Sequence, residues 1–459
     1  MPTFPLITHP HGDSIIAWRD GNAVGAARFL SDVAQLRAML PDGAHMLNAC
    51  NDRYRFMVGL AAAMTGKKAS LLPSTTTPEM IRQLLQFAPD AFCLTDVEGC
   101  SIALPQVRVP EFFEPLASAG TQYAVPAIDG EQLVAYVFTS GSTGAPLPHR
   151  KTWGSLVRNV QGEAQLCGMN DGRCHSIIGT VPAQHMYGFE SSILMVMQSA
   201  NALVAGSTFF PVDICNAVRS APVPRTLVST PVHLRSVLNA GAAGLDIPYV
   251  DRIISATAPL SSALAEELEA RFCTEMLEIY GSTETGQIAM RRPTRDKAWT
   301  LFPGVRLAQQ NGVSWISGGH VESSTRMHDV IEPIDEERFL LHGRTADLIN
   351  IAGKRSSLMY LNLQLNAIPG VLDGAFFMPD DEVADSVTRL TAFVAAPGLT
   401  AASLLAALRE RIDPVFLPRP VVFVERLPRN ATGKLPREAL QMLARENADS
   451  GQRSGEKPT

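Results

Sequence analysis

The stretch Thr139-Ser140-Gly141-Ser142-Thr143-Gly144 brings glycines and hydroxyl side chains together in a short span. Glycine lets the backbone turn its N–H groups toward an anion, and the hydroxyls add further donors. Such a loop suits a phosphate group, although a mobile surface loop has a similar composition. It is not the common nucleoside triphosphate loop, because no Lys-Ser or Lys-Thr pair follows Gly144.

A hydroxyl and a carboxylate, Thr283 and Glu284, stand just past the apolar run 276–280, which is typical of a strand. The hydroxyl can donate to a phosphate. Mg²⁺ prefers one or two carboxylates together with phosphate oxygens and water. The pair therefore suits a metal–phosphate group, and the alternative is a solvated turn with a helix-capping carboxylate.

Near the other end of the chain, Lys434 follows Gly433 in a predicted loop. A lysine on its flexible stem can reach two anions that repel each other, such as a carboxylate and a phosphate. The glycine lets the loop approach another surface closely. The alternative is a solvated lysine in a basic segment that also holds Arg429 and Arg437.

These three stretches and a fourth, 343–349, stand in an order and spacing that resembles the adenylate-forming (AMP-binding) enzyme family. This family includes acyl-CoA synthetases, aryl-acid AMP ligases and adenylation domains. The resemblance covers about residues 42–443. It implies a large multi-layered α/β domain at 1–343 that binds ATP and the acid, and a small, mobile α+β lid domain at 344–446 that carries Lys434. We expect residues 447–459 to be a disordered tail.

The resemblance also implies a role for each matched residue. Lys434, Thr283, Glu284 and Arg344 would be catalytic, with Glu284 also binding the metal. The acyl pocket would be bordered by His185, Tyr187 and Gly188, although a lone histidine is often structural. Ala346 stands at the hinge. The residues that would bind ATP or AMP are Thr139, Ser140, Gly141, Ser142, Thr143, Gly144, Thr257, Ala258, Pro259, Tyr280, Gly281, Ser282 and Asp329.

The sequence departs from the family pattern at two charged positions. Leu147 stands where the family loop usually has a lysine, and Ala346 stands where the hinge is usually Asp or Lys. Because basic residues follow Leu147 closely, we expect Arg150 or Lys151 to replace the missing lysine near the pyrophosphate. Met327 and His328 also replace the Thr-Gly that usually precedes Asp329.

The reaction implied by the resemblance has two steps. A carboxylic acid, fatty or aryl, attacks ATP with Mg²⁺ as cofactor to give an acyl-adenylate and pyrophosphate. A phosphopantetheine thiol, of CoA or of a carrier protein, then takes the acyl group and releases AMP. The motifs separate neither the acids nor the two thiols. The alternative is a catalytically impaired nucleotide-binding or scaffold protein of the same fold. Leu147 and Ala346 favour it, but the intact Thr283-Glu284 and Gly433-Lys434 argue against it.

Composition limits the other function classes. The chain has 459 residues, 46% of them hydrophobic and 18% charged, with a net charge of −6. No basic stripe indicates nucleic acid, and no apolar run approaches the roughly 20 residues of a membrane span. The amino terminus lacks the pattern of a signal peptide, and the seven cysteines show no metal-ligand spacing. We therefore expect a cytoplasmic protein with reduced thiols.

Alternating apolar runs and amphipathic segments predict a largely parallel sheet built from βαβ units. Predicted strands are 45–49, 69–72, 92–95, 134–138, 175–181, 202–205, 226–229, 252–256 and 276–280. Helices are expected at 26–40, 55–64, 187–198 and 261–272, with another beginning at Thr77-Pro78. We expect the glycine-hydroxyl loop to join the strand 134–138 to a helix that begins near Thr152. Shorter antiparallel strands are expected at 299–341. The small domain should have one helix, 402–412, and strands at 391–395 and 421–425.

Overall fold

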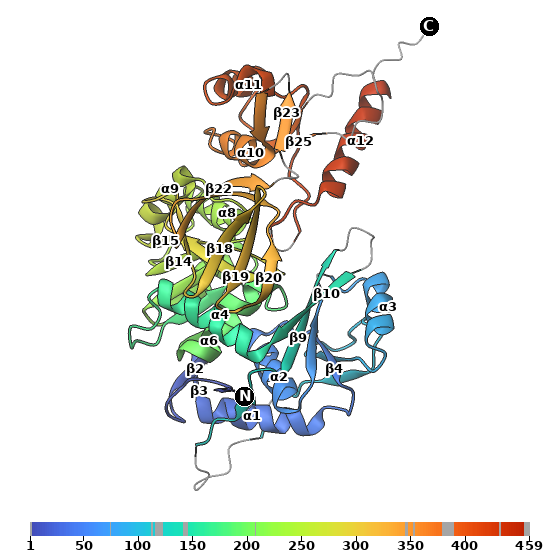
Figure 1. Cartoon of the computed structure of the whole chain (residues 1–459), viewed down its shortest axis with the longest axis vertical. Helices are drawn as coiled ribbons and strands as arrows, with labels where there is room; N and C mark the ends of the chain where they lie inside the picture. The colour runs from blue at the N-terminus through green and yellow to red at the C-terminus, as the bar shows by residue number, and fades with distance from the viewer. Residues whose placement is uncertain are drawn as a thin grey trace.

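A computed structural model of the whole chain shows a large part below and a smaller part above it (Figure 1). The structure describes residues 2–73, 75–111, 113–114, 123–140, 146–206, 208–344, 348–351, 354–378, 390–430 and 433–453. The fold class predicted from the sequence, a large α/β unit followed by a small α+β unit, is confirmed.

The amino-terminal part of the chain builds a six-stranded sheet, of which five strands are parallel. Strands β5 and β6 are buried on both faces, and their sequences are accordingly mostly apolar, with Ser70 and Thr95 as the exceptions. Helix α3 begins at Pro78 with Thr77 as its cap, as predicted. In sheet order the strands are β10 (Pro146–Thr152), β9 (Leu133–Ser140), β5 (Ala69–Leu72), β4 (His45–Asn48), β6 (Phe92–Thr95) and β7 (Gln106–Arg108), and the helices are α1 (Ala26–Met39), α2 (Arg53–Thr65) and α3 (Pro78–Phe87).

The second sheet has eleven strands, and its parallel centre is the βαβ region that the sequence predicts. In sheet order the strands are β21 (Asp329–Pro333), β22 (Arg338–Arg344), β17 (Trp299–Leu301), β16 (Gly286–Arg291), β15 (Glu275–Ser282), β14 (Arg252–Ser255), β13 (Arg225–Ser229), β11 (Ser176–Gly179), β12 (Ala202–Val204), β2 (Ile15–Arg19) and β3 (Asn22–Gly25).

Helices pack around these sheets, and short sheets complete the large part. The expected helix 187–198 is a continuous helical segment whose middle is a π-helix, at Phe189–Leu194. The helices are α4 (Trp153–Leu166), α5 (Met186–Gly188), α6 (Met195–Ser199), α7 (Pro211–Ser220), α8 (Pro231–Ala242) and α9 (Ser262–Phe272). The short sheets contain β1 (Thr3–Pro5) with β8 (Ala127–Asp129), and β18 (Val305–Gln310), β19 (Val313–Gly318) and β20 (Val321–Arg326).

The smaller part has its own hydrophobic core, which supports a separate domain. It has more elements than the sequence predicts, because its helix α10 and strand β25 carry weak periodic signals. Its elements are β23 (Leu348–Ile351), β24 (Lys354–Ser357), α10 (Leu358–Asn366), β25 (Asp373–Phe377), β26 (Thr391–Ala395), α11 (Ala401–Arg409), β27 (Val421–Phe423) and α12 (Arg437–Arg453). The boundary at 343/344 remains a prediction.

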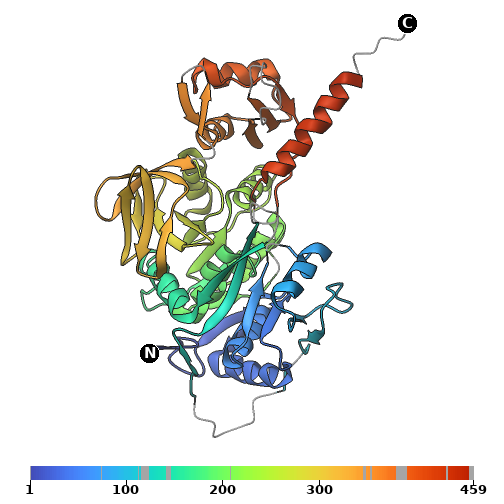
Figure 2. The ribbon, with the colours of Figure 1, turned by 45° about the vertical axis from the view of Figure 1, so that its right-hand side comes forward.

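Two expectations about local structure are wrong. The segment after the glycine-hydroxyl loop is strand β10, which pairs antiparallel with β9, so the loop joins two strands rather than a strand and a helix. In Figures 1 and 2 these paired strands rise toward α12. The tail expected from residue 447 is helical to Arg453, where it continues α12 beyond 437–446, a stretch rich in strong helix formers such as Ala, Leu, Glu and Arg. Residues 454–459 lie outside the described part of the chain.

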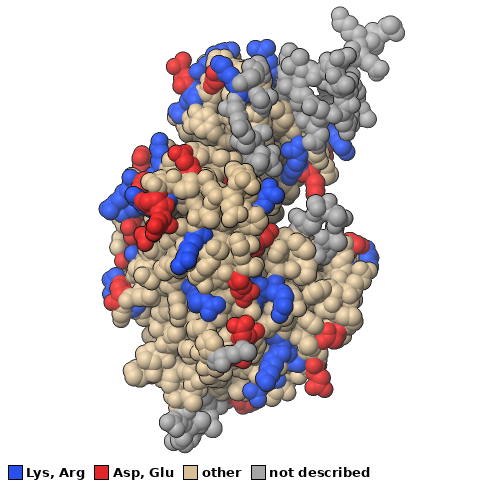
Figure 3. All heavy atoms as spheres, viewed as in Figure 1, with Lys and Arg blue, Asp and Glu red and all other residues tan. Residues whose placement is uncertain are grey.

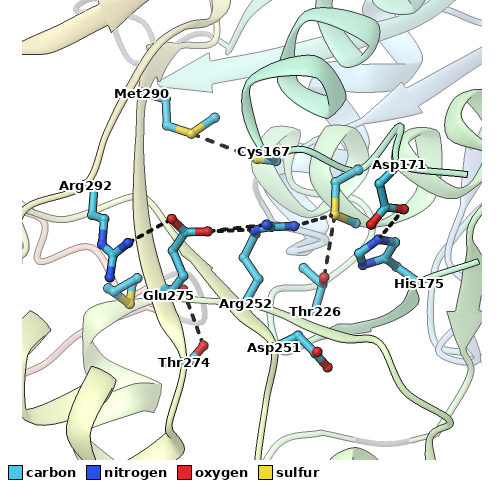
Figure 4. Close-up of polar contacts among 12 residues, drawn as sticks. Cys167, Asp171, His175, Thr226, Asp251, Arg252, Thr274, Glu275, Met290 and Arg292 are labelled. Atoms are coloured by element: carbon cyan, nitrogen blue, oxygen red, sulfur yellow. Dashed lines mark hydrogen bonds and ion pairs between the residues drawn. The ribbon is translucent and has the colours of Figure 1, made fainter. Parts of the chain in front are cut away.

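The amino-terminal edge of the large sheet is held by ion pairs (Figure 4). Arg252 and Glu275, the first residues of β14 and β15, pair at 3.3 Å. Arg292 binds the other oxygen of Glu275 at 3.0 Å. Arg252 also contacts the Met169 sulfur at 3.6 Å. These side chains bind one another across the amino-terminal ends of the strands. The carboxyl ends of the parallel strands, on the opposite side of the sheet, are the usual position for a ligand.

The surface agrees with the expected absence of a basic stripe, at least on one face. On the face shown in Figure 3, basic and acidic side chains are interspersed, and neither sign gathers into a patch. Among the described residues, no helix is both long and apolar enough to cross a membrane. All seven cysteines are free thiols, and four of them are buried, namely Cys50, Cys93, Cys167 and Cys215.

Candidate active site at the carboxyl edge of the large sheet

Three residues singled out in the sequence, and Thr230, follow neighbouring strands of the large sheet. His185 follows β11, Thr230 follows β13, Thr257 follows β14 and Thr283 follows β15. These strands are adjacent and parallel, so their carboxyl ends lie at one edge. The fold therefore collects residues that are up to about a hundred positions apart in the sequence.

The turn that carries Thr283 and Glu284 is closed by its flanking hydroxyls. The Ser282 and Thr285 side-chain oxygens lie 3.1 Å apart, and each hydroxyl accepts from the other residue's backbone N–H at 3.3 Å. The Glu284 side chain is 46% exposed. Partial burial would raise its pKa, but a hydrogen bond from Ser282 and the charges of His149 and Lys151 bring the pKa below the ordinary value. Glu284 is thus an ionised carboxylate open to solvent, as a metal ligand must be.

The basic residues that follow Leu147 are arranged differently from the sequence prediction. Lys151 is buried, and its Nζ donates to the backbone carbonyl of Thr283 at 2.6 Å, so it does not extend toward a pyrophosphate. Arg150 is exposed. His149 Nε2 lies 2.9 Å from Thr139 Oγ1 and 3.9 Å from Glu284 Oε1. This contact does not support Lys151 as the replacement for the missing lysine, and the other alternative, Arg150, stays a prediction.

Tyr280 and Asp329, two predicted nucleotide-binding residues, are joined directly. Tyr280 Oη donates to Asp329 Oδ2 at 2.7 Å. The Tyr280 ring packs against Trp299 and Phe339, with centroids 5.6 and 5.9 Å away. Packing against Trp299 and Phe339 orients the Tyr280 ring. The hydrogen bond from Tyr280 Oη in turn orients the Asp329 carboxylate. The sequence placed both residues in the site, but not in contact.

We expect Tyr280→Phe to weaken ATP binding without preventing folding. The change removes one hydrogen bond to a carboxylate and keeps the ring, so the Michaelis constant for ATP should rise by about 3- to 10-fold. The Michaelis constant for the acid and the thermal midpoint should change little. Steady-state kinetics with each substrate varied would check this. An unchanged ATP constant would show that the Tyr280–Asp329 contact does not position the nucleotide.

The loop that carries Lys434 contacts the large part at the start of α8. Gly433 has φ +77°, and a Cβ there would lie 3.3 Å from Val232 and 3.4 Å from Thr230 Oγ1. Asn430 shapes the loop by accepting from the Lys434 N–H at 2.9 Å. Arg429 binds Asp373 with two hydrogen bonds of 2.7 and 2.8 Å, which ties the loop to β25. Gly433 thus permits the close approach that the sequence predicts.

His185 and Lys434 come from different domains but affect each other electrostatically. Burial, with help from the positive charge of Lys434, lowers the pKa of His185 to about 4. His185 is therefore a neutral imidazole near pH 7. Tyr187, two residues on, is buried and donates from Oη to the Ile254 carbonyl at 2.9 Å. Gly188 is required by close packing, because a Cβ there would lie 2.2 Å from the Pro182 carbonyl oxygen.

Several predicted residues cannot be placed. Gly141, Ser142, Thr143 and Gly144, and the hinge residue Ala346, lie outside the described part of the chain. Ser140 ends β9 and Arg344 ends β22, and the described part excludes both side chains.

Thr257 has φ +76°, an uncommon conformation for a β-branched residue. Ala258, Pro259 and Gly281 lie at the same edge, after β14 and within β15.

Sequence reasoning missed two buried carboxylates beneath the site. Glu163, in α4, and Glu190, in the π-helix, are both fully buried. Burial raises the pKa of each to about 8, although the charge of Lys151 opposes this at Glu190. In the sequence both look like ordinary polar positions of helices. The signal that could have found them is an apolar residue one turn away, such as Leu166 for Glu163 and Ile193 for Glu190.

The stability of the protein should depend on pH through Glu163. The folded state keeps this proton up to about pH 8, whereas an unfolded glutamate loses it near pH 4.3, so stability falls between these values. Glu163→Gln cannot ionise and should gain stability relative to wild type as the pH rises, by roughly 1.4 kcal/mol per pKa unit of the shift. Denaturant unfolding at pH 4.5 and 8.5 would check this. Parallel profiles for the two proteins would contradict it.

Comparison with known proteins agrees with this geometry. Residues 41–310 match the model of the AMP-binding enzyme family, and residues 365–434 match the AMP-binding enzyme C-terminal domain. A 4-coumarate–CoA ligase of Rhodobacter capsulatus is 31% identical over 312 residues, which are 67% of this chain and 76% of the relative.

Solved structures share the fold. An anthranilate CoA ligase, AuaEII, in complex with anthranoyl-AMP superposes with a TM-score of 0.78 at 15% identity, covering 97% of this chain and 99% of the other. ATP-bound MatB of Rhodopseudomonas palustris gives 0.77 at 18% identity, covering 95% and 97%.

The chain therefore belongs to the AMP-binding enzyme family. Within it, the chain is an AMP-forming acid–thiol ligase, which activates a carboxylic acid with ATP as co-substrate and passes the acyl group from the adenylate to a thiol.

Proposed function

We propose that this protein joins an aromatic carboxylic acid to coenzyme A. The observation that carries the proposal is the convergence, at one sheet edge, of the Thr283–Glu284 turn, the Tyr280–Asp329 pair and the Lys434 loop. These groups suit a nucleotide, its α-phosphate and a carboxylate. The aromatic acid is suggested by relatives named for 4-coumarate and 4-chlorobenzoate.

Each residue at this edge has a role that its chemistry supports. Asp329 accepts from the ribose hydroxyls, and the segment 257–259 lines the base. Thr283 donates to the α-phosphate. Lys434 bridges the acid carboxylate and the α-phosphate, and so offsets their repulsion. Neutral His185 lies beside the acid without adding a second positive charge. Arg344 contacts ribose and phosphate, and Ala346 is the hinge.

Glu284 would hold Mg²⁺. The described residues contain no cluster of three or more His, Cys, Asp or Glu side chains that could hold a metal. An ionised, half-exposed carboxylate fits a Mg²⁺ that takes its other ligands from phosphate oxygens and water. When bound, the ion neutralises charge on the phosphates as it builds up around phosphorus.

The acceptor thiol has two possible sources, free CoA and a phosphopantetheinylated carrier protein. The relatives named as CoA ligases favour CoA. A cytoplasmic location, where ATP and CoA are both available, stays a prediction.

The test is ATP–pyrophosphate exchange with a panel of aliphatic and aryl acids, followed by thioester formation with CoA or with a carrier protein. We expect exchange to be fastest with aryl acids and CoA to be acylated. Exchange that favours aliphatic acids would contradict the choice of acid. Transfer only to the carrier protein would contradict the choice of thiol.

A further inference from the structure

Strand β10 presents two side chains to the turn that carries Thr283 and Glu284. His149 and Lys151 are two residues apart on one strand, so they point to the same face. His149 Nε2 lies 3.9 Å from Glu284 Oε1, and Lys151 Nζ donates to the Thr283 carbonyl at 2.6 Å. Arg150, between them, is exposed on the other face. One face of β10 is thus fitted to the turn.

The Lys151 ammonium is a buried charge with acidic neighbours. Lys151 is only 6% exposed, and burial lowers the pKa of its ammonium, although the charges of Glu190, Glu322 and Glu284 oppose this. Burying a charged group costs free energy unless the group is paired and hydrogen-bonded. Stability alone therefore does not account for a lysine here, and its contact with the Thr283 carbonyl does.

Two more buried side chains hold the backbone that follows. His320 Nε2 lies 3.1 Å from the Thr285 carbonyl oxygen, and Asn159 Nδ2 donates to the Gln287 carbonyl at 2.9 Å. Together with the Lys151 contact, these side chains bind the carbonyls of residues 283, 285 and 287, which is every second carbonyl of this stretch. The backbone from Thr283 to Gln287 is therefore hydrogen-bonded to buried polar side chains at every second carbonyl.

We propose that Lys151 is a positioning residue, which holds the Thr283 carbonyl so that the Thr283 hydroxyl and the Glu284 carboxylate face the α-phosphate. This inference rests on the phosphate role proposed above for the turn. Lys151 itself does not touch the substrate. Because its hydrogen bond goes to this turn, its loss should affect recognition of the α-phosphate and spare recognition of the nucleoside.

The test compares binding of AMP and adenosine to Lys151→Met by calorimetry in EDTA, where no divalent metal contributes. Met keeps the length of the side chain and removes the charge and the donor. The dissociation constant for AMP should rise by about tenfold, because hydrogen bonds to charged groups are worth about 1.5–3 kcal/mol. The constant for adenosine should change less than about twofold, and Lys151→Arg should restore part of the AMP affinity.

Lys354→Met is the matched control, because it makes the same substitution at an exposed lysine that pairs with Asp413 and has no role in the site. It should leave both constants unchanged. If Lys151→Met does not fold, Lys151→Gln is measured in its place, since an amide keeps a polar group at the buried position.

The outcomes separate the two levels of the proposal. A wild-type protein that binds AMP no more tightly than adenosine would overturn the phosphate role of the turn. A wild-type preference for AMP that survives removal of Lys151, or an equal loss for both ligands, would overturn the positioning role alone.

Discussion

Replacing Glu284 with Gln is expected to lower the rate of ATP–pyrophosphate exchange by about 10²- to 10³-fold, the usual cost of removing one electrostatic contact at a reacting centre. Gln keeps the shape of the side chain but has no charge with which to hold Mg²⁺. Glu284 is half exposed, and the described hydroxyls around it close the turn by themselves. The free energy of unfolding should therefore stay within about 0.5 kcal/mol of the wild-type value.

The reason for a large effect is that Glu284 is the exposed carboxylate on this turn and that its pKa is below the ordinary value. It is thus ionised at every pH at which the enzyme is assayed. Its loss should also raise the Mg²⁺ concentration needed for half-maximal exchange, which a metal titration measures directly.

A matched control is Glu332→Gln, which removes an exposed carboxylate that pairs with His342 at 2.7 Å on β21 and β22. This variant should keep wild-type exchange. Full activity of Glu284→Gln at ordinary Mg²⁺ concentrations would remove Glu284 from the metal site, and the ligand would then have to come from another carboxylate.

Much of the large domain was predictable, because parallel strands buried on both faces are short, mostly apolar runs. Strands β4, β5 and β6 begin and end within a residue or two of the predicted bounds. Their order of alternation with helices predicts parallel pairing. It also predicts that residues just past the strand ends meet at one edge, and the Thr283–Glu284 turn does lie there.

Strand β10 could not be predicted for a physical reason. Pro146 and Pro148 lack the N–H that a central strand needs, so the segment looks like a loop. β10 is the edge strand of its sheet, where a missing donor is tolerated. The segment becomes a strand because it pairs with β9, and the composition of 146–152 alone does not reveal this pairing.

The position of Lys151 depends on a contact between residues 132 positions apart. In sequence, a basic residue near a phosphate loop suggests a phosphate ligand. Side chains alternate between the two faces of β10, so the face of Lys151 decides whether it can reach a phosphate or the Thr283 carbonyl. That face can be assigned only if the segment is first recognised as a strand. The buried Glu190 was missed for the same kind of reason, because its burial comes from the elements that surround the π-helix.

Replacing Lys434 with Ala is expected to reduce formation of the acyl-adenylate by about 10²- to 10³-fold. In the proposed role, the ammonium offsets the repulsion between two anions, the acid carboxylate and the α-phosphate, that must be brought together. The loop is already seated on Thr230 and Val232, so the lysine needs no long movement to act. Its effect on the pKa of His185 indicates that its charge is felt inside the site.

The same variant should form thioester from a supplied acyl-adenylate at close to the wild-type rate. The carboxylate and phosphate are already joined in that substrate, so no repulsion remains to be offset. If the small domain turns away to admit the thiol, Lys434 also leaves the site before this step. The measurement is a pair of single-turnover assays, one for each half-reaction.

Lys354→Ala is the control, because Lys354 is an exposed lysine of the same domain and is paired with Asp413. It should leave both half-reactions unchanged. A Lys434→Ala variant that is slow in both halves would indicate faulty docking of the small domain, since docking serves both steps. A variant that is slow in neither would mean that Lys434 is a solvated surface residue. Loss of the first half-reaction alone is the result that assigns Lys434 to the joining of the two anions.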